Sequence, residues 1–348
     1  MSNVFDNTAF DGHEQVVFCS DAATGLRAVI AIHSTRLGPA AGGCRMYPYA
    51  TIEDAVTDVL RLSKGMSYKN ALAGLELGGG KAVIIADSRG DRKPELLSAF
   101  AKHVQALGGR YWTAIDVGVG VDDVAHMSRD TDFTFTLVDE GAGRLNPAVF
   151  TALGGYVSIE ATVRHVMASE TLKGVRFAIQ GLGQTGMDLC RRLTEAGGQV
   201  VATDVNGDAM ASARQQYGIE VTQPDEIYDA EVDVFVPCAL GAILNDETIP
   251  RLKAKAVCGL ANNQLQEPRH GDALRERGIV YAPDYVVNAG GVIYGSDDIF
   301  KTHDTSVAED KIRGIGAVLL EIFARSDKER RATSDIADDM ARSRMGGG

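Results

Sequence analysis

The apolar positions of the chain form short strand-like runs and helical repeats, and their arrangement changes near residue 146. In the first part, Gln15–Cys19 and Leu26–Ile32 flank a turn and predict a hairpin of two strands. Thr51 can cap a helix whose apolar residues recur at the helical period as far as Met66. This part also predicts a buried strand at 82–86, a helix that Pro94 opens and Gly108-Gly109 closes, and a strand from Tyr111 to Ile115 that ends at Asp116.

The second part alternates short apolar runs with helical segments. Asn146-Pro147 predicts the start of a long helix that continues to about Met167. Strands are predicted at 175–179, 199–203, 232–236, 256–260 and 279–282, and helices at 185–197, 306–325 and 328–342. This alternation is typical of βαβ crossovers in a parallel, doubly wound sheet.

We therefore expect an α/β protein with two domains. The first, residues 1–145, would be an α/β substrate or catalytic domain that also dimerises. The second, residues 146–327, would be a Rossmann-type domain that binds a dinucleotide. The C-terminal helix at about 328–348 could return to the first domain.

Composition and charge exclude several classes of protein. The 35 basic and 47 acidic residues give a net charge of −12, which repels nucleic acids and anionic membrane surfaces. No apolar run approaches the ~20 residues of a membrane-spanning helix, and the N-terminus has no signal-peptide pattern. The 5 cysteines are far apart and form neither a C-x-x-C pair nor a cluster with histidine. We expect a cytoplasmic, metal-free protein without nucleic-acid or membrane partners.

A glycine-rich segment predicts the cofactor site. Gly181-Leu-Gly-Gln-Thr-Gly186 fits G-x-G-x-x-G, and it follows an apolar strand and opens a helix, which is the context that makes this pattern informative. Gly181 would permit the tight turn, Gly183 would let backbone approach the pyrophosphate, and Gly186 would let helix pack on strand. The next strand ends at Asp204, whose carboxylate would accept hydrogen bonds from the adenine ribose and repel a 2′-phosphate. The pattern favours NAD over NADP.

Two unusual stretches of the first domain suggest the chemistry. Gly38–Arg45 and Gly74–Lys81 are glycine-rich, and three consecutive glycines before Lys81 indicate that backbone passes close to another group. If Lys69 and Lys81 converge on one cleft, repulsion and burial could leave one of them neutral and able to act as a base. Asp116, on what we expect to be a flexible loop, would be a proton donor and acceptor. Each of the three could equally be an ordinary salt-bridge residue.

Taken together, these stretches resemble the glutamate/leucine/phenylalanine/valine dehydrogenase superfamily, most of all its leucine and phenylalanine branch. The matching motifs, in family order over residues 14–325, are Gly38–Met46, Lys64–Gly74, Leu77–Lys81, Asp116-Val-Gly, the Gly181 loop, Pro237-Cys-Ala239, Ala261-Asn-Asn263 and Tyr281–Gly291. The resemblance implies an N-terminal catalytic domain, a C-terminal NAD domain, a cleft between them that closes on the substrate, and a homo-oligomer.

The resemblance also implies roles for individual residues. Lys69 would bind the substrate carboxylate with help from Asn288, Lys81 would activate water, and Asp116 would carry the proton to and from the substrate nitrogen. The substrate would lie beside Lys69, Asn288, Gly42, Gly43, Ala41, Ala114, Val292 and Gly295. The dinucleotide would lie beside Gly181, Leu182, Gly183, Gln184, Thr185, Gly186, Asp204, Thr151, Cys238, Ala239 and Asn262. The predicted reaction is reversible, NAD-dependent oxidative deamination of an amino acid to a 2-oxo acid and ammonia.

The choice of substrate is less sharply predicted. Ala41 stands where glutamate enzymes place a charge, so a non-polar amino acid is expected, with leucine or another branched-chain substrate first. Ala41 and Gly295 are smaller than the residues usual in this branch, which would enlarge the pocket and favour phenylalanine or larger side chains as the alternative. Two remote alternatives are a 2-hydroxy acid dehydrogenase and a non-catalytic, nucleotide-binding homologue. The first would need a histidine base that the 7 histidines do not place near any motif.

Overall fold

The computed structural model describes residues 3–138, 145–302 and 304–346. It forms two compact units: unit 1 comprises Met1–Asn146, Val292–Thr305 and Ala341–Gly348, and unit 2 comprises Pro147–Gly291 and Ser306–Met340. The sequence placed the boundary near residue 145 but did not separate residues 292–305 from the second domain. Residues 347–348 of the expected terminal helix lie outside the described residues.

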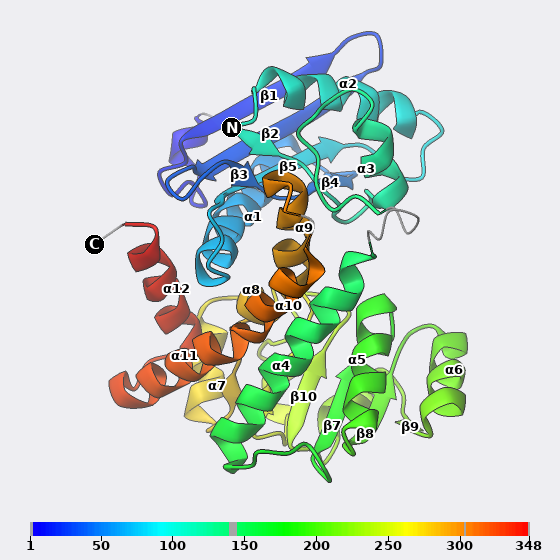
Figure 1. Ribbon diagram of the computed structural model, residues 1–348, viewed down its shortest axis with the longest axis vertical. Coiled ribbons are helices and arrows are strands. Elements are labelled where there is room, and N and C mark those ends of the chain that lie inside the picture. Colours follow the sequence, from blue (N-terminus) through cyan, green and yellow to red (C-terminus); the bar gives the residue numbers. More distant parts are fainter. Residues whose placement is uncertain (1–2, 139–144, 303, 347–348) are drawn as a thin grey trace. The chain divides into compact units, whose positions relative to one another are not determined.

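The strands and helices have the following bounds (Figure 1). The strands are β1 Gln15–Asp21, β2 Leu26–Ser34, β3 Ala40–Ala41, β4 Cys44–Tyr47, β5 Gly78–Ile85, β6 Tyr111–Trp112, β7 Arg176–Gln180, β8 Gln199–Thr203, β9 Glu220–Val221, β10 Val234–Pro237, β11 Ala256–Val257 and β12 Val280–Tyr281. The α-helices are α1 Ile52–Leu72, α2 Lys93–Ala106, α3 Val121–Met127, α4 Pro147–Met167, α5 Gln184–Glu195, α6 Gly207–Tyr217, α7 Arg269–Glu276, α8 Asp284–Val287, α9 Gly290–Phe300, α10 Thr305–Arg313, α11 Ile315–Glu329 and α12 Thr333–Arg344. Short 3-10 helices lie at Val4–Asp6, Glu226–Asp229 and Ile249–Arg251.

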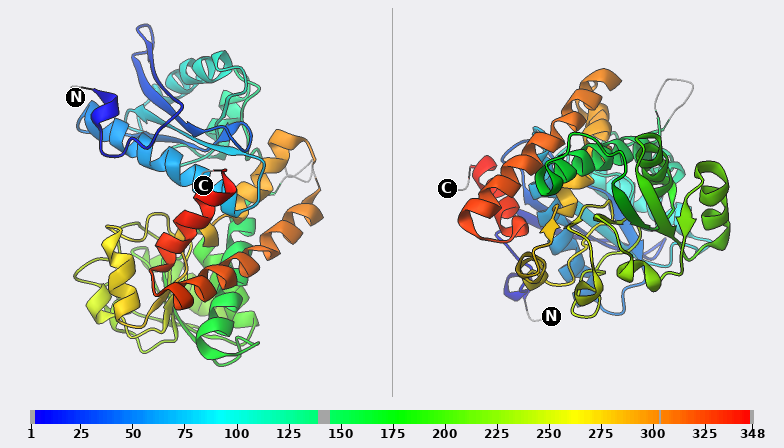
Figure 2. Two further views of the ribbon diagram at one scale, coloured as in Figure 1. Left: turned by 90° about the vertical axis from the view of Figure 1, so that its left-hand side faces the viewer. Right: turned by 90° about the horizontal axis from the view of Figure 1, so that it is seen from below.

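Unit 1 is built on a mixed sheet with helices on both faces. The strand order is β1-β2-β5-β3-β6, and β4 also pairs with β5. The predicted hairpin is confirmed, because β1 and β2 pair antiparallel from Gln15↔Ile32 to Asp21↔Leu26. The α1 helix covers one face through apolar side chains such as Val56 and Leu60, and α2 and α3 cover the other (Figure 2).

Helix α1 begins where the sequence predicts. The Thr51 side chain accepts a hydrogen bond from the Asp54 N–H, and the Asp54 carboxylate accepts one from the Thr51 N–H, so both form a capping box. Apolar residues at the helical period then bury one side of the helix against β2 and β5. The capping box and the helical period of the apolar residues both indicate a helix that begins after Thr51, so this helix could be predicted from the sequence.

Unit 2 contains the predicted parallel sheet, and the expected fold class is confirmed. Its strand order is β12-β11-β10-β7-β8-β9, and all its pairs are parallel. The chain leaves β7 toward β8 and later returns to β10 on the other side of β7. The carboxyl ends of β7 and β10 therefore form a topological switch point, the place where open α/β sheets bind ligands.

Several sequence predictions were wrong in their bounds, and three of them show why. The glycines 78–80 lie within β5 and not before it, because neighbouring groups approach too closely for any side chain there. The strand predicted from Tyr111 to Ile115 contracts to β6, Tyr111–Trp112. The helix predicted at 306–325 is divided into α10 and α11 at Gly314, and α11 continues to Glu329, where Arg330 in the left-handed conformation (φ 56°) ends it.

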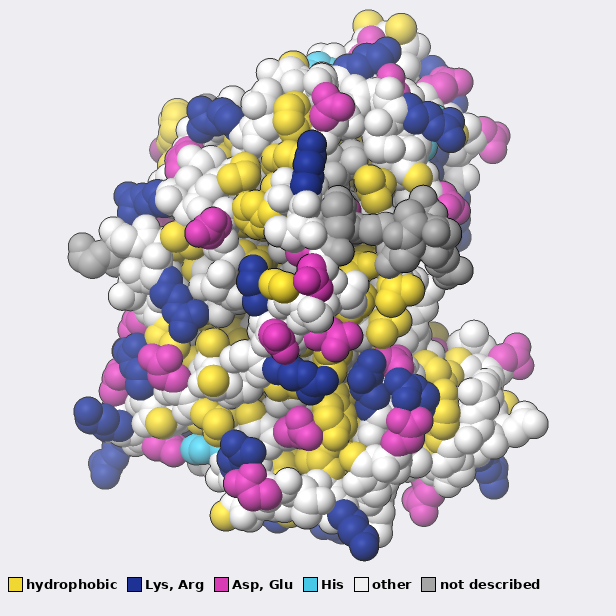
Figure 3. Space-filling view, viewed as in Figure 1, with side chains coloured by type: hydrophobic (Ala, Val, Ile, Leu, Met, Phe, Trp, Pro, Cys, Tyr) yellow, Lys and Arg dark blue, Asp and Glu magenta, His cyan; other side chains and the backbone are white. Residues whose placement is uncertain are grey.

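The surface carries both signs of charge. On the face drawn in Figure 3, basic and acidic side chains are interspersed, without the extended basic area typical of nucleic-acid-binding proteins. Among the helices of the described residues, none is both long enough and apolar enough to span a membrane.

Candidate active site

The main chemical feature of unit 1 is a buried ion pair between Lys81 and Asp116. Lys81 lies in β5 with 5% of its surface exposed, and its Nζ contacts Oδ2 of Asp116. The Oδ1 atom of Asp116 accepts hydrogen bonds from Nε of Arg45 at 3.0 Å and from the Val117 N–H at 2.6 Å. Burial would raise the pKa of Asp116, but the positive charges of Lys81 and Arg45 outweigh burial and lower it to about 2.

The sequence suggested that Asp116 lies on a flexible loop, whereas in the structure hydrogen bonds hold this loop in place. The side chain of Asp116 is 13% exposed, and its backbone exchanges hydrogen bonds with Val119 in both directions, at 3.1 and 2.9 Å. Three donors, two of them the cations Lys81 and Arg45 and the third the Val117 N–H, hold the carboxylate in one orientation. The sequence pattern predicted Asp116 as a site residue, but it did not predict the contacts that fix its side chain and backbone.

Glycines bring the backbone close to this pair. A Cβ at Gly43 would lie 2.1 Å from the Ile115 carbonyl oxygen, and one at Gly42 would lie 1.9 Å from the Gly80 carbonyl oxygen. The hydroxyl of Tyr111 donates to the Gly42 carbonyl at 2.7 Å. Any side chain at Gly42 or Gly43 would push the strand ends apart, so the glycines are required by packing. The role of Tyr111 was not predicted, since no local pattern marks a buried hydroxyl.

Lys69 lies near the end of α1 and is half-buried. Two residues earlier, the backbone of Ser67 lies so close to Gly79 that a Cβ on Gly79 would be 2.1 Å from the Ser67 nitrogen. Lys81 follows Gly79 by two positions and therefore projects from the same face of β5, the face that α1 covers. Both lysines thus lie on one side of the sheet, and the partner that the structure gives the Lys81 ammonium is Asp116.

The residues expected around the substrate side chain are small and tightly packed. Ala41 and Ala114 are 0% and 2% exposed. Val292 lies half-buried in α9. A Cβ at Gly295 would lie 2.6 Å from Cγ2 of Thr136 and 3.2 Å from the Phe135 ring. The expectation that Gly295 enlarges a pocket is therefore wrong, because Thr136 and Phe135 fill the space that the missing side chain leaves.

The glycine loop of unit 2 fits a dinucleotide. Gly181 has φ +105° and faces Ala239, and a Cβ at Gly186 would lie 2.1 Å from the Gly181 carbonyl oxygen. At Gly183 a Cβ would meet nothing within 4 Å, and this residue is the N-cap of α5 without a side-chain cap. Open space in front of uncapped N–H groups at a helix N-terminus suits a phosphate. Leu182 is buried, and Gln184 and Thr185 form the first turn of α5.

The neighbouring strand ends complete this candidate cofactor site. Asp204 follows β8, and its Oδ2 accepts a hydrogen bond from the Leu182 N–H at 2.6 Å, so the carboxylate lies beside the glycine loop. The Cys238 N–H after β10 donates to the Gln180 carbonyl at 2.7 Å, next to Ala239. The sequence missed two apolar side chains here, Val205 at 94% and Leu240 at 76% exposure. Exposed aliphatic groups at strand ends can cover an aromatic base.

A pair of asparagines lies further along the same sheet edge. Nδ2 of Asn288 donates to Oδ1 of Asn262 at 2.8 Å and to the Leu260 carbonyl at 3.2 Å. Oδ1 of Asn288 is buried and has no hydrogen-bond partner among the described residues. Thr151 lies in the first turns of α4, where its hydroxyl donates to the Pro147 carbonyl at 3.1 Å and faces Gly291. The unpaired oxygen of Asn288 is an acceptor that a ligand N–H can satisfy.

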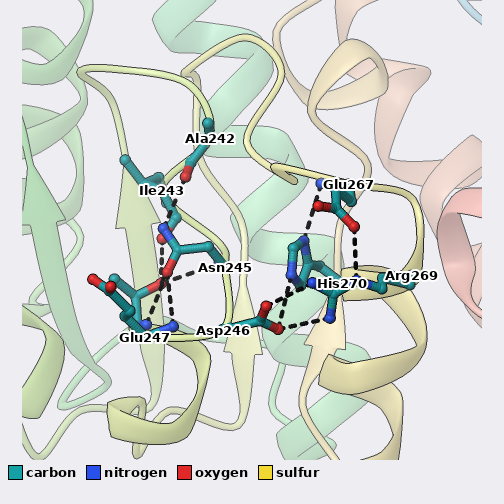
Figure 4. A network of polar contacts seen from close by, with 9 residues as sticks. Ala242, Ile243, Asn245, Asp246, Glu247, Glu267, Arg269 and His270 are labelled. Carbon is teal, nitrogen blue, oxygen red and sulfur yellow. Dashed lines mark hydrogen bonds and ion pairs between the residues drawn. The ribbon is translucent and has the colours of Figure 1, made fainter.

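A polar network supports the segments that carry these residues (Figure 4). Oδ1 of Asp246 contacts Nε2 of the fully buried His270 at 3.2 Å, and both carboxylate oxygens accept from Arg269. The Glu267 N–H donates to Nδ1 of His270 at 3.0 Å. This network joins the segment after β10 to the segment after β11.

Fold and site together define the class of protein: an α/β oxidoreductase with a dinucleotide-binding unit and a separate unit that carries acid–base groups. The sequence profile described as Glu/Leu/Phe/Val dehydrogenase, dimerisation domain, matches residues 13–133, and the one described as Glutamate/Leucine/Phenylalanine/Valine dehydrogenase matches residues 204–313. The chain belongs to this family, and it is an enzyme that uses a pyridine nucleotide and acts on a small molecule.

Individual relatives cover nearly the whole chain. Leucine dehydrogenase of Geobacillus stearothermophilus is 46% identical over 96% of this chain and 90% of its own length. Phenylalanine dehydrogenase of Caldalkalibacillus thermarum is 46% identical over 96% of this chain and 91% of its own length. Among solved structures, L-tryptophan dehydrogenase from Nostoc punctiforme has a TM-score of 0.84 and 41% identity, with 96% of each chain covered.

Proposed function

We propose that the protein catalyses the reversible, NAD-dependent oxidative deamination of a non-polar L-amino acid. In the balanced reaction, the amino acid, NAD⁺ and water give the 2-oxo acid, ammonium, NADH and a proton. The observation that carries the proposal is the buried contact between Lys81 and Asp116, because this reaction needs a base for water and a proton carrier for nitrogen.

The residues of unit 1 would divide the proton transfers among them. A dinucleotide held by the glycine loop of unit 2 would supply the acceptor for the hydride of the substrate α-carbon. Lys81 would remove a proton from the attacking water, and Asp116 would pass a proton to and from the substrate nitrogen. Their direct contact gives a path for moving a proton between amine and carboxylate. Lys69, on the same side of the sheet, would hold the substrate carboxylate as an ammonium.

Asn288 has a more specific proposed role than the resemblance implies. Both hydrogens of its amide are engaged by Asn262 and by the Leu260 carbonyl, so no donor remains for a carboxylate. Its unpaired Oδ1 suits an N–H donor instead. We propose that Oδ1 of Asn288 accepts a hydrogen bond from a ligand N–H, such as that of the substrate amino group.

Branched-chain amino acids are the first proposed substrates, and aromatic ones are the alternative. Ala41 and Ala114 supply no charge for a polar side chain. Leucine dehydrogenases at 46% and 45% identity support the first choice. The aromatic alternative is supported by the phenylalanine dehydrogenase at 46% identity and the tryptophan dehydrogenase at 41% identity.

NAD, a homo-oligomeric assembly and a cytoplasmic location complete the proposal. The carboxylate of Asp204 beside the Leu182 N–H supports NAD, because it would repel a 2′-phosphate. The profile described as a dimerisation domain, matched at residues 13–133, supports a homo-oligomer. The 5 cysteines, all free thiols, support a reducing compartment.

The test is a panel of L-amino acids, branched, aromatic and acidic, assayed with NAD⁺ and separately with NADP⁺. We expect nucleotide reduction with branched-chain or aromatic substrates, little with glutamate, and a preference for NAD⁺ of at least about tenfold. A chain that reduces neither nucleotide with any amino acid, yet binds NADH, would refute the proposed reaction.

A further inference from the structure

Arg45 lies in the glycine-rich stretch that the sequence singled out, yet the function proposed above gives it no role. It belongs to β4, and its side chain is 19% exposed. Its Nε donates to Oδ1 of Asp116 at 3.0 Å, and its Nη1 donates to Oδ2 of Asp58 on α1 at 2.9 Å. One guanidinium thus joins the carboxylate of the candidate proton carrier to a second carboxylate.

The contacts form a continuous chain of charges. Lys81 contacts Oδ2 of Asp116, Arg45 contacts Oδ1, Asp58 holds the other end of Arg45, and the Tyr49 hydroxyl donates to Asp58. Lysine, aspartate, arginine and aspartate therefore alternate in sign. Although burial opposes its charge, the two carboxylates raise the pKa of Arg45, so the guanidinium remains a cation.

The backbone around Arg45 is fixed to the backbone that carries Asp116. A side chain at Gly43 would collide with the Ile115 carbonyl, and the Met46 N–H donates to the Val117 carbonyl at 2.9 Å. Arg45 therefore approaches Asp116 from a rigid neighbouring strand. A planar guanidinium held in this way fixes the orientation of the carboxylate as well as its charge.

We propose that Arg45 is a positioning residue for the deamination, which rests on the function proposed above. It occupies one oxygen of Asp116 so that the other oxygen faces Lys81, and it keeps the carboxylate ionised between proton transfers. Asp58 acts through Arg45 and holds the guanidinium in place.

The titratable groups around Asp116 give the proposal a signed consequence. They are Lys81 on β5, Arg45 on β4 with Asp58 and Tyr49 behind it, the buried thiol of Cys44 on β4 and the buried hydroxyl of Tyr111 on β6. Removing the Arg45 cation makes protonation of Asp116 easier, so the pKa of Asp116 rises. Removing the Asp58 anion has the opposite effect. If the reaction needs the ionised carboxylate of Asp116, the midpoint of its acidic limb should therefore move to higher pH without Arg45 and to lower pH without Asp58.

The experiment measures kcat/KM against pH for the full chain and for the Arg45→Met, Arg45→Lys and Asp58→Asn variants. We expect Arg45→Met to lower kcat/KM about 100-fold and to move the acidic limb up by about one pH unit. Arg45→Lys keeps the charge but not the fork, so it should stay about tenfold slower with the parent midpoint. Asp58→Asn should move the midpoint of the acidic limb to lower pH. Arg61→Met, on the exposed side of the same helix as Asp58, is the control and should match the parent.

Shifts of the acidic midpoint of kcat/KM in opposite directions in the two variants distinguish a positioning role from a non-specific structural effect of the substitutions. If Arg45→Met and Asp58→Asn both lose rate with the parent midpoint, or if Arg45→Met matches the parent, the proposal is overturned. If Arg45→Met does not fold, the Arg45→Lys and Asp58→Asn pair decides. An unaltered enzyme that deaminates no amino acid would overturn the proposed function instead, so the two failures are distinguishable.

Discussion

The two units prepare their sites in opposite ways. In unit 1 the site is formed by charged side chains: Lys81 is buried, Asp116 and Arg45 are half-buried, and both Lys81 and Arg45 contact Asp116. In unit 2 the site is formed by the backbone. A side chain at Gly181 or Gly186 would collide with neighbouring atoms, and one at Gly183 would enter the open space in front of the helix N-terminus. The difference follows from the task. Proton transfer needs groups that change charge, whereas holding a dinucleotide needs close approach and fixed N–H donors.

The comparison predicts that the two sites fail separately. A substitution among the unit 1 charges should reduce the chemical rate and leave nucleotide binding intact. A substitution among the unit 2 glycines should do the reverse. If single substitutions in either unit reduced the chemical rate and nucleotide binding together, the two units would not have the separate roles described here.

The largest expected effect is that of Lys81→Met. It removes the proposed base and leaves Asp116 without its cation, so kcat should fall at least about a thousandfold. NADH affinity, measured by fluorescence titration, should stay within about twofold because Lys81 belongs to unit 1. Lys102→Met, at an exposed position of α2, is the control. Turnover within tenfold of the parent would remove Lys81 from the mechanism.

The second effect compares two glycines of one loop. In Gly186→Ala the new Cβ would lie 2.1 Å from the Gly181 carbonyl oxygen, so NADH affinity should fall about 100-fold and the melting temperature should drop. In Gly183→Ala the new methyl meets nothing within 4 Å, so stability should be unchanged and affinity should fall about tenfold. Calorimetry and titration check both. A Gly183→Ala variant that binds NADH like the parent would show that the open space is not where the phosphate lies.

The third effect concerns the packing between α9 and the segment that carries Thr136 in unit 1. Gly295→Ala would place a Cβ 2.6 Å from Cγ2 of Thr136, and we expect a loss of about 2 kcal/mol in unfolding free energy. Thr136 has φ 64°, so Thr136→Gly relieves backbone strain and removes the clashing methyl. The double variant should recover most of the loss in denaturant unfolding. If the double variant is no more stable than Gly295→Ala, the contact between these positions does not govern the packing.

The smallest effect is a pH dependence of stability far from the acid–base pair. Burial, with the neighbouring His13 ring next, lowers the pKa of His33 to about 4, while the Asp11 carboxylate opposes this shift and Lys64 adds to it. The unfolded chain therefore binds a proton below about 6.5 that the folded chain binds only near pH 4. This contribution to stability should be fully present above this range, and the free energy of unfolding should fall by about 1 kcal/mol as the pH drops from 7 to 5.5.

His33→Gln is the variant that tests this dependence. It cannot take up the proton, and its amide can still face Ser67, whose Oγ lies 2.8 Å from Nδ1 of His33. The slope of stability against pH should become shallower in this variant. An unchanged slope would assign the pH dependence to other groups.

Local patterns predicted the elements that local interactions determine. The Thr51 cap, the start of α4 at Pro147 and the strand before Gly181 were all correct, because cap, proline and glycine act within a few residues. The parallel sheet followed from the alternation of strands and helices. The site residues Lys81 and Asp116 were proposed from a lysine after glycines and an aspartate after a strand, and the structure brings them into contact.

Features set by distant contacts were missed. Arg45 and Asp116 are 71 positions apart, and no periodicity connects them. The glycines 78–80 have low strand propensity, yet they lie in β5 because Ser67 and Tyr111 leave no room for side chains. The space at Gly295 seemed open only because Thr136 and Phe135 come from another part of the chain. Each miss concerns what a residue packs against, which a single sequence does not specify.

The most direct test of the central claim is the reverse reaction of the unaltered protein. NADH and 4-methyl-2-oxopentanoate are mixed with and without ¹⁵N-labelled ammonium, and the product is identified by mass spectrometry. We expect NADH oxidation only with ammonium and a product that is leucine carrying the label. NADH oxidation that proceeds without ammonium and yields a 2-hydroxy acid would contradict the account.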